Sequence, residues 1–165
     1  MKRRGIQIDI PGFRTLNITA VCSDYTGTLS LEGQLLHGVK RRLHELAELV
    51  EIHVVTSDTR GTARQELKGI PLELKIISGQ KHDRLKNNYM KTHFDPKHTV
   101  VLGNGRNDRL WMRTVKESGG LSIAIDAGEG CAVEAMTNAD IFLIGSTSAL
   151  DLLLDPDRIK ATLRS

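Results

Sequence analysis

Short apolar runs alternate along this chain with amphipathic stretches, and the two patterns predict strands and helices in turn. Residues 6–10 (Ile-Gln-Ile-Asp-Ile) alternate apolar and polar side chains, which is the period of a half-exposed strand. Residues 39–49 carry apolar side chains at helical spacing, which predicts a helix packed through one face. Because strands and helices alternate throughout, we expect a layered α/β fold with a mainly parallel sheet.

The same two patterns predict the remaining elements. Strands are expected at residues 16–22, 52–55, 72–77, 99–102, 121–125 and 140–144. Helices are expected at residues 62–67, 82–92, 110–115, 131–136 and 149–154, with a further turn after Pro156. The first two strands are expected to pair through a Pro11-Gly12 turn. Residues 28–36 are expected to form a small hairpin about Glu32-Gly33, which could fold over a crevice as a flap.

Composition limits the classes of function. The net charge is +3 and aromatic residues make up 4% of the chain, so there is little with which to bind and stack nucleic-acid bases. No apolar run approaches the roughly 18 to 20 residues that span a bilayer, and no signal peptide is recognisable. Two cysteines fit a reducing compartment. We therefore expect one cytoplasmic domain over residues 1–165, without a membrane or nucleic-acid partner.

Three of the predicted strands end in polar residues suited to phosphoryl transfer. These residues are Asp24 and Thr26, then Thr56 or Ser57, and finally Asn104 and Asp108. The carboxyl ends of parallel strands meet at one edge of a sheet, where open α/β folds bind their ligands. A carboxylate there can attack phosphorus, while hydroxyl and ammonium groups hold phosphate oxygens and acidic groups hold a hard cation. The stretch around Asp24 alone fits an ordinary turn equally well; the order of the three strand ends favours phosphoryl transfer.

At these positions the sequence resembles the haloacid dehalogenase (HAD) superfamily of phosphatases. Its four motifs correspond to residues 24–29 (Asp-Tyr-Thr-Gly-Thr-Leu), residues 54–56 (Val-Val-Thr), a lysine, and residues 103–108 (Gly-Asn-Gly-Arg-Asn-Asp). The first motif is most similar to the phosphorylation motif of P-type ATPases. Over nearly its full length, the chain resembles the small soluble P-type ATPase-like HAD proteins. In that group an Ile-Pro-Gly-Phe hairpin, here residues 10–13, precedes the first motif.

The resemblance implies a HAD-like Rossmannoid three-layer fold with an N-terminal β-hairpin, a small flap and no cap domain. It also implies roles for individual residues. The implied catalytic residues are Asp24 as nucleophile, Thr26, Thr56 and Lys86. The implied substrate-binding residues are Gly27, Thr56, Ser57 and Lys86. The implied ligands of Mg²⁺ are Asp24, the backbone carbonyl of Thr26, Asn104 and Asp108, with Asn107 bracing the loop.

The lysine of the third motif has two candidates. Lys86 is preferred because it lies about one helix and one strand before Gly103, as in the family pattern. Lys81 is the alternative, while Lys75 and Lys91 are expected to be solvated.

Two positions depart from the commonest phosphatase pattern. Phosphatases of this superfamily usually carry a general acid two residues after the nucleophile, and here that position is Thr26. General acid–base help is typically worth ~10²–10⁴-fold in rate, so hydrolysis of unactivated esters should be slow. Asn104 replaces an acid of the fourth motif and removes one negative charge near the metal. His37, beside the flap, is an alternative acid.

We expect a Mg²⁺-dependent phosphohydrolase that works through an aspartyl-phosphate on Asp24. It should favour substrates with good leaving groups and act on a phosphorylated small molecule or a macromolecular phosphate. The gaps between motifs are too short for a cap, so a bulky substrate or a neighbouring subunit of a homo-oligomer could complete the site. Two other classes stay open: a catalytically weak scaffold that binds or regulates a partner, and a phosphoacceptor signalling module. The acceptor of such modules lies on a later strand, which disfavours the second class.

Overall fold

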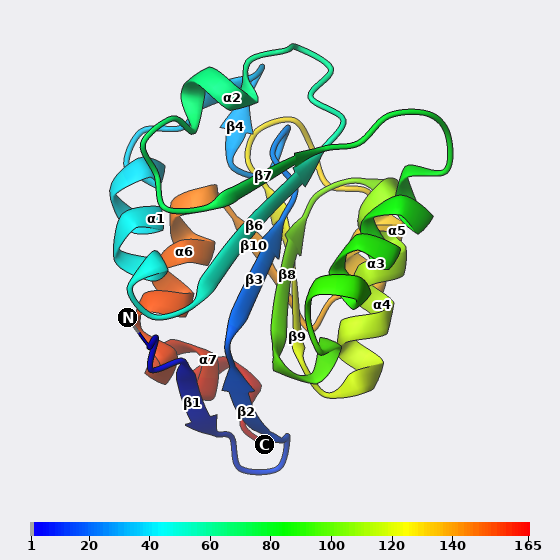
Figure 1. Ribbon diagram of the computed structural model, residues 1–165. Helices are drawn as coiled ribbons and strands as arrows, with labels where there is room; N and C mark the ends of the chain where they lie inside the picture. The colour runs from blue at the N-terminus through cyan, green and yellow to red at the C-terminus, as the bar shows by residue number, and fades with distance from the viewer. Residues whose placement is uncertain (1) are drawn as a thin grey trace.

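A six-stranded parallel sheet forms the centre of the computed structural model, which describes residues 2–165 (Figure 1). In order across the sheet, its strands are β10 (Ile141–Ile144), β9 (Leu121–Asp126), β8 (Thr99–Gly103), β3 (Ala20–Ser23), β6 (Glu51–Thr56) and β7 (Glu73–Ile76). The central strand β3 pairs with β8 on one side and β6 on the other. Its carboxyl end is therefore flanked by the ends of both neighbours.

Helices cover both faces of this sheet and form two separate cores. On one face lie α1 (Val39–Ala47) and α6 (Ser146–Leu154); on the other lie α3 (His82–His93), α4 (Arg109–Ser118) and α5 (Val133–Thr137) (Figure 1). Successive residues of β8 point into the two cores in turn: Val100 and Leu102 pack in the core under α1 and α6, and Val101 packs in the core under α3, α4 and α5. A strand of a parallel sheet is buried on both faces, which explains the continuous apolar run from Val100 to Leu102.

Two small antiparallel hairpins accompany the central sheet. At the N-terminus, β1 (Ile6–Asp9) pairs with β2 (Thr15–Ile18), as the alternating pattern predicts. After β3, β4 (Ser30–Leu31) pairs with β5 (Gln34–Leu35) and forms the expected flap. The short helix α2 (Ala63–Glu66) lies beside this flap. No cap domain interrupts residues 2–165, so the predicted fold class is confirmed.

The structure corrects two sequence-based expectations. Residues 16–22 are not one strand, because the chain leaves the hairpin at Thr19. The Thr19 amide donates to the His98 carbonyl, and the Thr19 carbonyl accepts from the Glu51 amide. Thr19 therefore bonds to residues at the start of the central sheet and not to the hairpin. The segment after Pro156 is not a single turn but the helix α7 (Pro156–Leu163). Proline at the first position of a helix favours helix formation, and Ile159 on the inner face of α7 is buried.

Residues 2–165 contain no helix that is both long and apolar enough to cross a membrane.

Candidate active site

The site forms at the carboxyl end of β3, where Asp24 leaves the sheet. The Asp24 backbone amide donates to the Leu102 carbonyl at 2.9 Å, which extends the pairing with β8 by one residue. Its side chain is nearly buried. Thr56 ends the neighbouring strand β6, and Asn104 follows β8 directly. The topology therefore places all three strand-end motifs at one edge of the sheet, as predicted.

Lys86 reaches this edge from α3 and bridges two carboxylates. Its Nζ lies 2.9 Å from Asp24 Oδ1 and 2.8 Å from Asp108 Oδ1. The Lys86 side chain is completely buried. Lys81, in contrast, is exposed at the helix N-cap, where its backbone is left-handed. Of the two candidate lysines, the structure thus brings Lys86 and not Lys81 to the nucleophile position.

The environment of Lys86 keeps its ammonium group charged. Burial lowers the Lys86 pKa, but the attraction of Asp108 and Asp24 outweighs burial, and the pKa lies above its ordinary value. The indole ring of Trp111 adds a cation–π contact, with its centroid 5.2 Å from Nζ. The ammonium is therefore desolvated, fixed in place and positive. These are the properties needed to stabilise charge on a phosphoryl group.

Asp108 is fully buried and has both carboxylate oxygens engaged. Oδ1 accepts from Lys86, and Oδ2 accepts from the backbone amides of Asn104 at 3.1 Å and Gly105 at 3.0 Å. Burial raises the Asp108 pKa to about 6, with Lys86 opposing the rise, so the carboxyl is ionised at neutral pH. These contacts place Asp108 to hold the lysine and the loop after β8. Its role as a metal ligand stays a prediction.

Glycine is required where the loop after β8 folds over Asp108. A Cβ added at Gly103 would lie 2.4 Å from Asp108 Cγ. Gly27 stands in a similar position on the facing loop: its φ is +73°, and an added Cβ would lie 2.4 Å from Asn104 Nδ2. Gly103 therefore lets its own loop close over Asp108, and Gly27 lets the facing loop approach Asn104.

The residues predicted to hold Mg²⁺ offer oxygen ligands of the right kind but little charge. The Asp24 carboxylate has one oxygen on Lys86, and the Asn104 amide oxygen accepts from Thr28 Oγ1 at 3.2 Å. Within residues 2–165 there is no cluster of three or more His, Cys, Asp or Glu side chains fit to hold a metal. The predicted set has two carboxylates, one amide oxygen and the Thr26 carbonyl. It fits Mg²⁺, which keeps several of its waters, better than a cation needing an all-protein cage.

The loop after β6 is organised by an aspartate that the motifs did not identify. Thr56 is buried, and its Oγ1 accepts from the Asp58 amide at 3.0 Å. Asp58 Oδ1 in turn accepts from the amides of Thr62 and Ala63, at 3.0 and 3.1 Å, where α2 begins. Ser57 lies half-buried between them. An acidic residue just before a predicted helix is the signal that could have identified Asp58.

The flap is held at its turn from both sides of the site. Tyr25 OH and Thr62 Oγ1 both donate to the Gly33 carbonyl, at 2.9 and 2.5 Å. The Glu32 amide donates to Glu129 Oε1 at 2.5 Å, which joins the turn to the loop after β9. Nothing in the sequence singles out Glu129, because the contact joins residues far apart in the chain. Thr26 is half-buried beneath this flap, and the alternative acid His37 is exposed after β5.

Comparison with known proteins agrees with this geometry. No family model matches the chain. The uncharacterized protein MJ0073 of Methanocaldococcus jannaschii is 35% identical over 68 residues, which cover 41% of this chain and 69% of that protein. The chain belongs to the same family as MJ0073.

Solved structures identify the fold. A haloacid dehalogenase-like hydrolase from Streptococcus pneumoniae has a TM-score of 0.58 at 14% identity, covering 81% of this chain and 97% of that one. The cobalt-bound deoxy-D-mannose-octulosonate 8-phosphate phosphatase from Haemophilus influenzae has a TM-score of 0.62 at 14% identity, covering 90% and 94%. The chain therefore has the fold of a haloacid dehalogenase-like hydrolase.

A third similar structure contains ligands. The 3-deoxy-D-manno-octulosonate 8-phosphate phosphatase from Moraxella catarrhalis, in complex with magnesium, phosphate and its sugar, has a TM-score of 0.55. It is 18% identical to this chain, with 89% of this chain and 94% of that one covered. The recognition of a HAD fold from the four motifs is therefore confirmed.

Proposed function

We propose that this HAD-fold protein is a Mg²⁺-dependent phosphohydrolase that works through an aspartyl-phosphate on Asp24. The observation that carries the proposal is the position of the buried Lys86 ammonium, 2.9 Å from Asp24 and 2.8 Å from Asp108 at the carboxyl edge of the sheet. The likeness to two proteins named as sugar-phosphate phosphatases, one of them in complex with magnesium and phosphate, supports the same function.

Each residue has a defined part in this proposal. A carboxylate oxygen of Asp24 attacks phosphorus, and the bond from phosphorus to the leaving oxygen breaks. Lys86 offsets the negative charge on the transferring oxygens. The Thr56 hydroxyl, which accepts from the Asp58 amide, would donate to one of those oxygens. Bound Mg²⁺, held by Asp24, the Thr26 carbonyl, Asn104 and Asp108, would supply further positive charge.

The preference for substrates follows from Thr26. A hydroxyl cannot protonate the leaving oxygen as a carboxylic acid does, so groups that depart as stable anions are favoured. Acyl phosphates, phosphoanhydrides and aryl phosphates meet this condition. The same residue lacks the basicity to activate water, so the phosphoenzyme should break down slowly.

The substrate is proposed to be a phosphorylated small molecule or macromolecule that enters an uncapped site. In this proposal residues 1–165 act as one cytoplasmic hydrolase domain, alone or as a homo-oligomer.

A catalytically weak scaffold is the second candidate. Asn104 favours it, because one negative charge is missing beside the metal position and the amide also accepts from Thr28. Such a protein would use the same site to bind a phosphorylated partner without turning it over.

Hydrolysis of p-nitrophenyl phosphate separates the two candidates. We expect Mg²⁺-dependent release of nitrophenol from the wild-type protein and none from Asp24→Asn, which keeps the shape of the side chain but removes the attacking charge. Asp157→Asn is the matched control, because Asp157 is exposed on α7. Equal rates for wild type and Asp24→Asn would overturn the nucleophile assignment. Mg²⁺-dependent phosphate binding without hydrolysis would favour the scaffold.

A further inference from the structure

A groove lined by arginines lies beside the proposed active site, where the loop after β8 meets α3 and α5. It consists of two adjoining hollows of about 270 and 360 Å³, which share Arg106 and Arg109. The first hollow is completed by Asn107 and by the start of α3. The second continues along α4 to Arg113 and reaches Glu134 on α5.

Two residues that line the groove lie close along the chain to residues of the proposed site. Asn107 directly precedes Asp108, which holds the Lys86 ammonium. His82 lines the first hollow and lies one helical turn before Lys86, about 6 Å along the axis at the usual rise of a helix. A small molecule with its phosphate on Asp24 could therefore extend into this groove.

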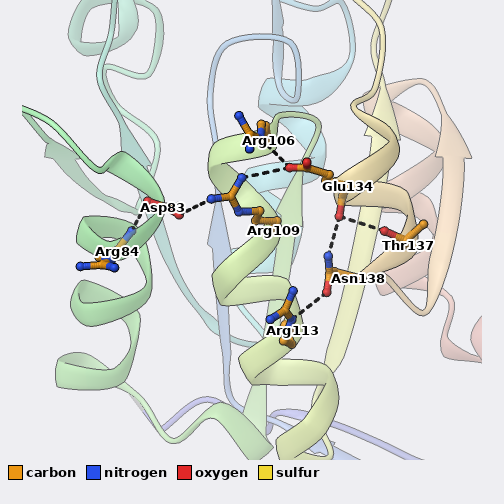
Figure 2. A network of polar contacts seen from close by, with 8 residues as sticks. All are labelled: Asp83, Arg84, Arg106, Arg109, Arg113, Glu134, Thr137 and Asn138. Atoms are coloured by element: carbon orange, nitrogen blue, oxygen red, sulfur yellow. Dashed lines mark hydrogen bonds and ion pairs between the residues drawn. The ribbon is translucent and has the colours of Figure 1, made fainter.

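Acidic and amide side chains hold the arginines in fixed orientations (Figure 2). Glu134 Oε2 accepts from Arg106 Nε at 2.7 Å and from Arg109 Nη1 at 3.0 Å. Asp83 Oδ2 accepts from Arg109 Nη2 at 3.0 Å, and Asn138 Oδ1 accepts from Arg113 Nε at 3.0 Å. The guanidinium groups are thus positioned along one face by partners on α3 and α5.

These contacts use only part of the N–H groups of Arg106 and Arg113. Among residues 2–165, nothing is hydrogen-bonded to Nη1 or Nη2 of Arg106 or of Arg113. The three guanidinium groups face two carboxylates, so the groove keeps a net positive charge. The Arg106 side chain is 72% exposed, and ion pairs as exposed as this one contribute little to stability. Folding alone therefore does not account for three arginines gathered along this groove.

We infer that this groove binds a second anionic group of the substrate, a carboxylate or a second phosphate, while the phosphate to be transferred lies on Asp24. The planar fork of an arginine matches both anions, because two parallel N–H groups can bond two oxygens of either one. The inference rests on the proposed phosphohydrolase function and narrows its substrate class. The substrate is then a small phosphorylated molecule with a separate negative charge a few bonds away.

Matched substrate pairs test this inference, because only the second anion differs within a pair. Phenyl phosphate with 3-carboxyphenyl phosphate tests a carboxylate, and phenyl phosphate with 1,3-phenylene bisphosphate tests a second phosphate, so every substrate is an aryl phosphate with a good leaving group. We expect the anionic member of at least one pair to have at least a tenfold higher kcat/KM, mostly through a lower KM. The pair that responds identifies the anion.

Arginine variants test whether the groove causes the difference in kcat/KM within a pair. In Arg106→Gln/Arg113→Gln, the ratio of kcat/KM within the responding pair should fall toward one. Arg84→Gln is the matched control, since Arg84 is an exposed arginine on α3 outside the lining of both hollows. Its ratio should stay at the wild-type value.

Three results would overturn the inference: a wild-type ratio near one in both pairs, a ratio kept in the double variant, or an equal fall in Arg84→Gln. The phosphohydrolase proposal would survive each of them, provided that the substrates are hydrolysed in an Asp24-dependent way. If no substrate is hydrolysed, both proposals fail together.

Discussion

At the scale of single residues, the account depends on one buried lysine between two carboxylates. Lys86 could be preferred over Lys81 from its spacing to the fourth motif, and the structure places it at Asp24. The participation of Asp108 in holding Lys86 was not predictable from the sequence, which indicates a metal ligand at that position. Both Asp108 oxygens are engaged by Lys86 and the loop amides, and such contacts form only in the folded chain. The role of Asp108 as a metal ligand stays a prediction.

Lys86→Met should lower kcat/KM for aryl phosphate by at least about tenfold, which corresponds to about 1.4 kcal/mol of transition-state stabilisation. Lys81→Met should change it much less, since Lys81 is exposed at the N-cap of α3. Steady-state kinetics on both variants measure the difference. A larger loss in the Lys81 variant would move the phosphate-binding role to that residue.

Lys86→Met should also destabilise the fold by roughly 3–5 kcal/mol, because it leaves a buried carboxylate without its partner. The double variant Lys86→Met/Asp108→Asn removes both charges and should recover part of that loss. Urea unfolding of the wild type, both single variants and the double variant gives the coupling energy. Simple addition of the two single effects would contradict a direct interaction between the pair.

At the scale of elements, the sequence predicted the hairpins and helices well and the contacts between loops poorly. The flap was predictable because Glu32-Gly33 is a turn signal between apolar residues. Its attachment to Glu129 and Thr62 was not, since those contacts join residues separated by many positions in the chain. The break at Thr19 was likewise hidden, because residues on both sides of it are apolar and buried alike.

The loop after β8 provides a test of close packing. Gly103→Ala places a methyl group against the Asp108 carboxyl and should cost about 1–3 kcal/mol of stability. Gly105→Ala is the matched control, because its added Cβ would meet the end of the Asn107 side chain, 2.6 Å away, which can rotate. Thermal unfolding should show the larger loss for Gly103→Ala. Equal losses would mean that Asp108 is not tightly confined.

The stability of the fold should depend on pH through Tyr25, whose hydroxyl donates to the turn of the flap. Burial raises the pKa of Tyr25 to about 12, and burial also raises the pKa of Tyr89, from an ordinary value near 10. The folded protein therefore keeps both phenols protonated where the unfolded chain ionises, so stability should be full below pH 10 and fall as pH rises toward 12. Absorbance at 295 nm near pH 10.5 should show less tyrosinate in the folded protein than in the protein unfolded by urea. Ionisation of both tyrosines at the ordinary value would contradict the buried contact of Tyr25 with the flap.

At the scale of the whole molecule, the order of strands in the sheet brings the residues of the site together. The order of strands places β3 between β6 and β8, so residues distant in sequence lie at the same edge of the sheet. This much followed from the alternation of strands and helices. The arginine groove did not, because its residues come from a loop and three helices whose relative packing no local pattern reveals.

The central claim is that Asp24 carries the phosphoryl group, and acid-quench trapping tests it most directly. Wild type and Asp24→Asn are mixed with Mg²⁺ and an acyl or aryl phosphate, quenched in acid during turnover, digested and analysed by mass spectrometry. Because Thr26 provides no effective base for hydrolysis, we predict a hydroxylamine-sensitive phosphoryl group on the peptide containing Asp24, and none in the variant. Sustained turnover with no such modification, or the same modification in Asp24→Asn, would contradict the account.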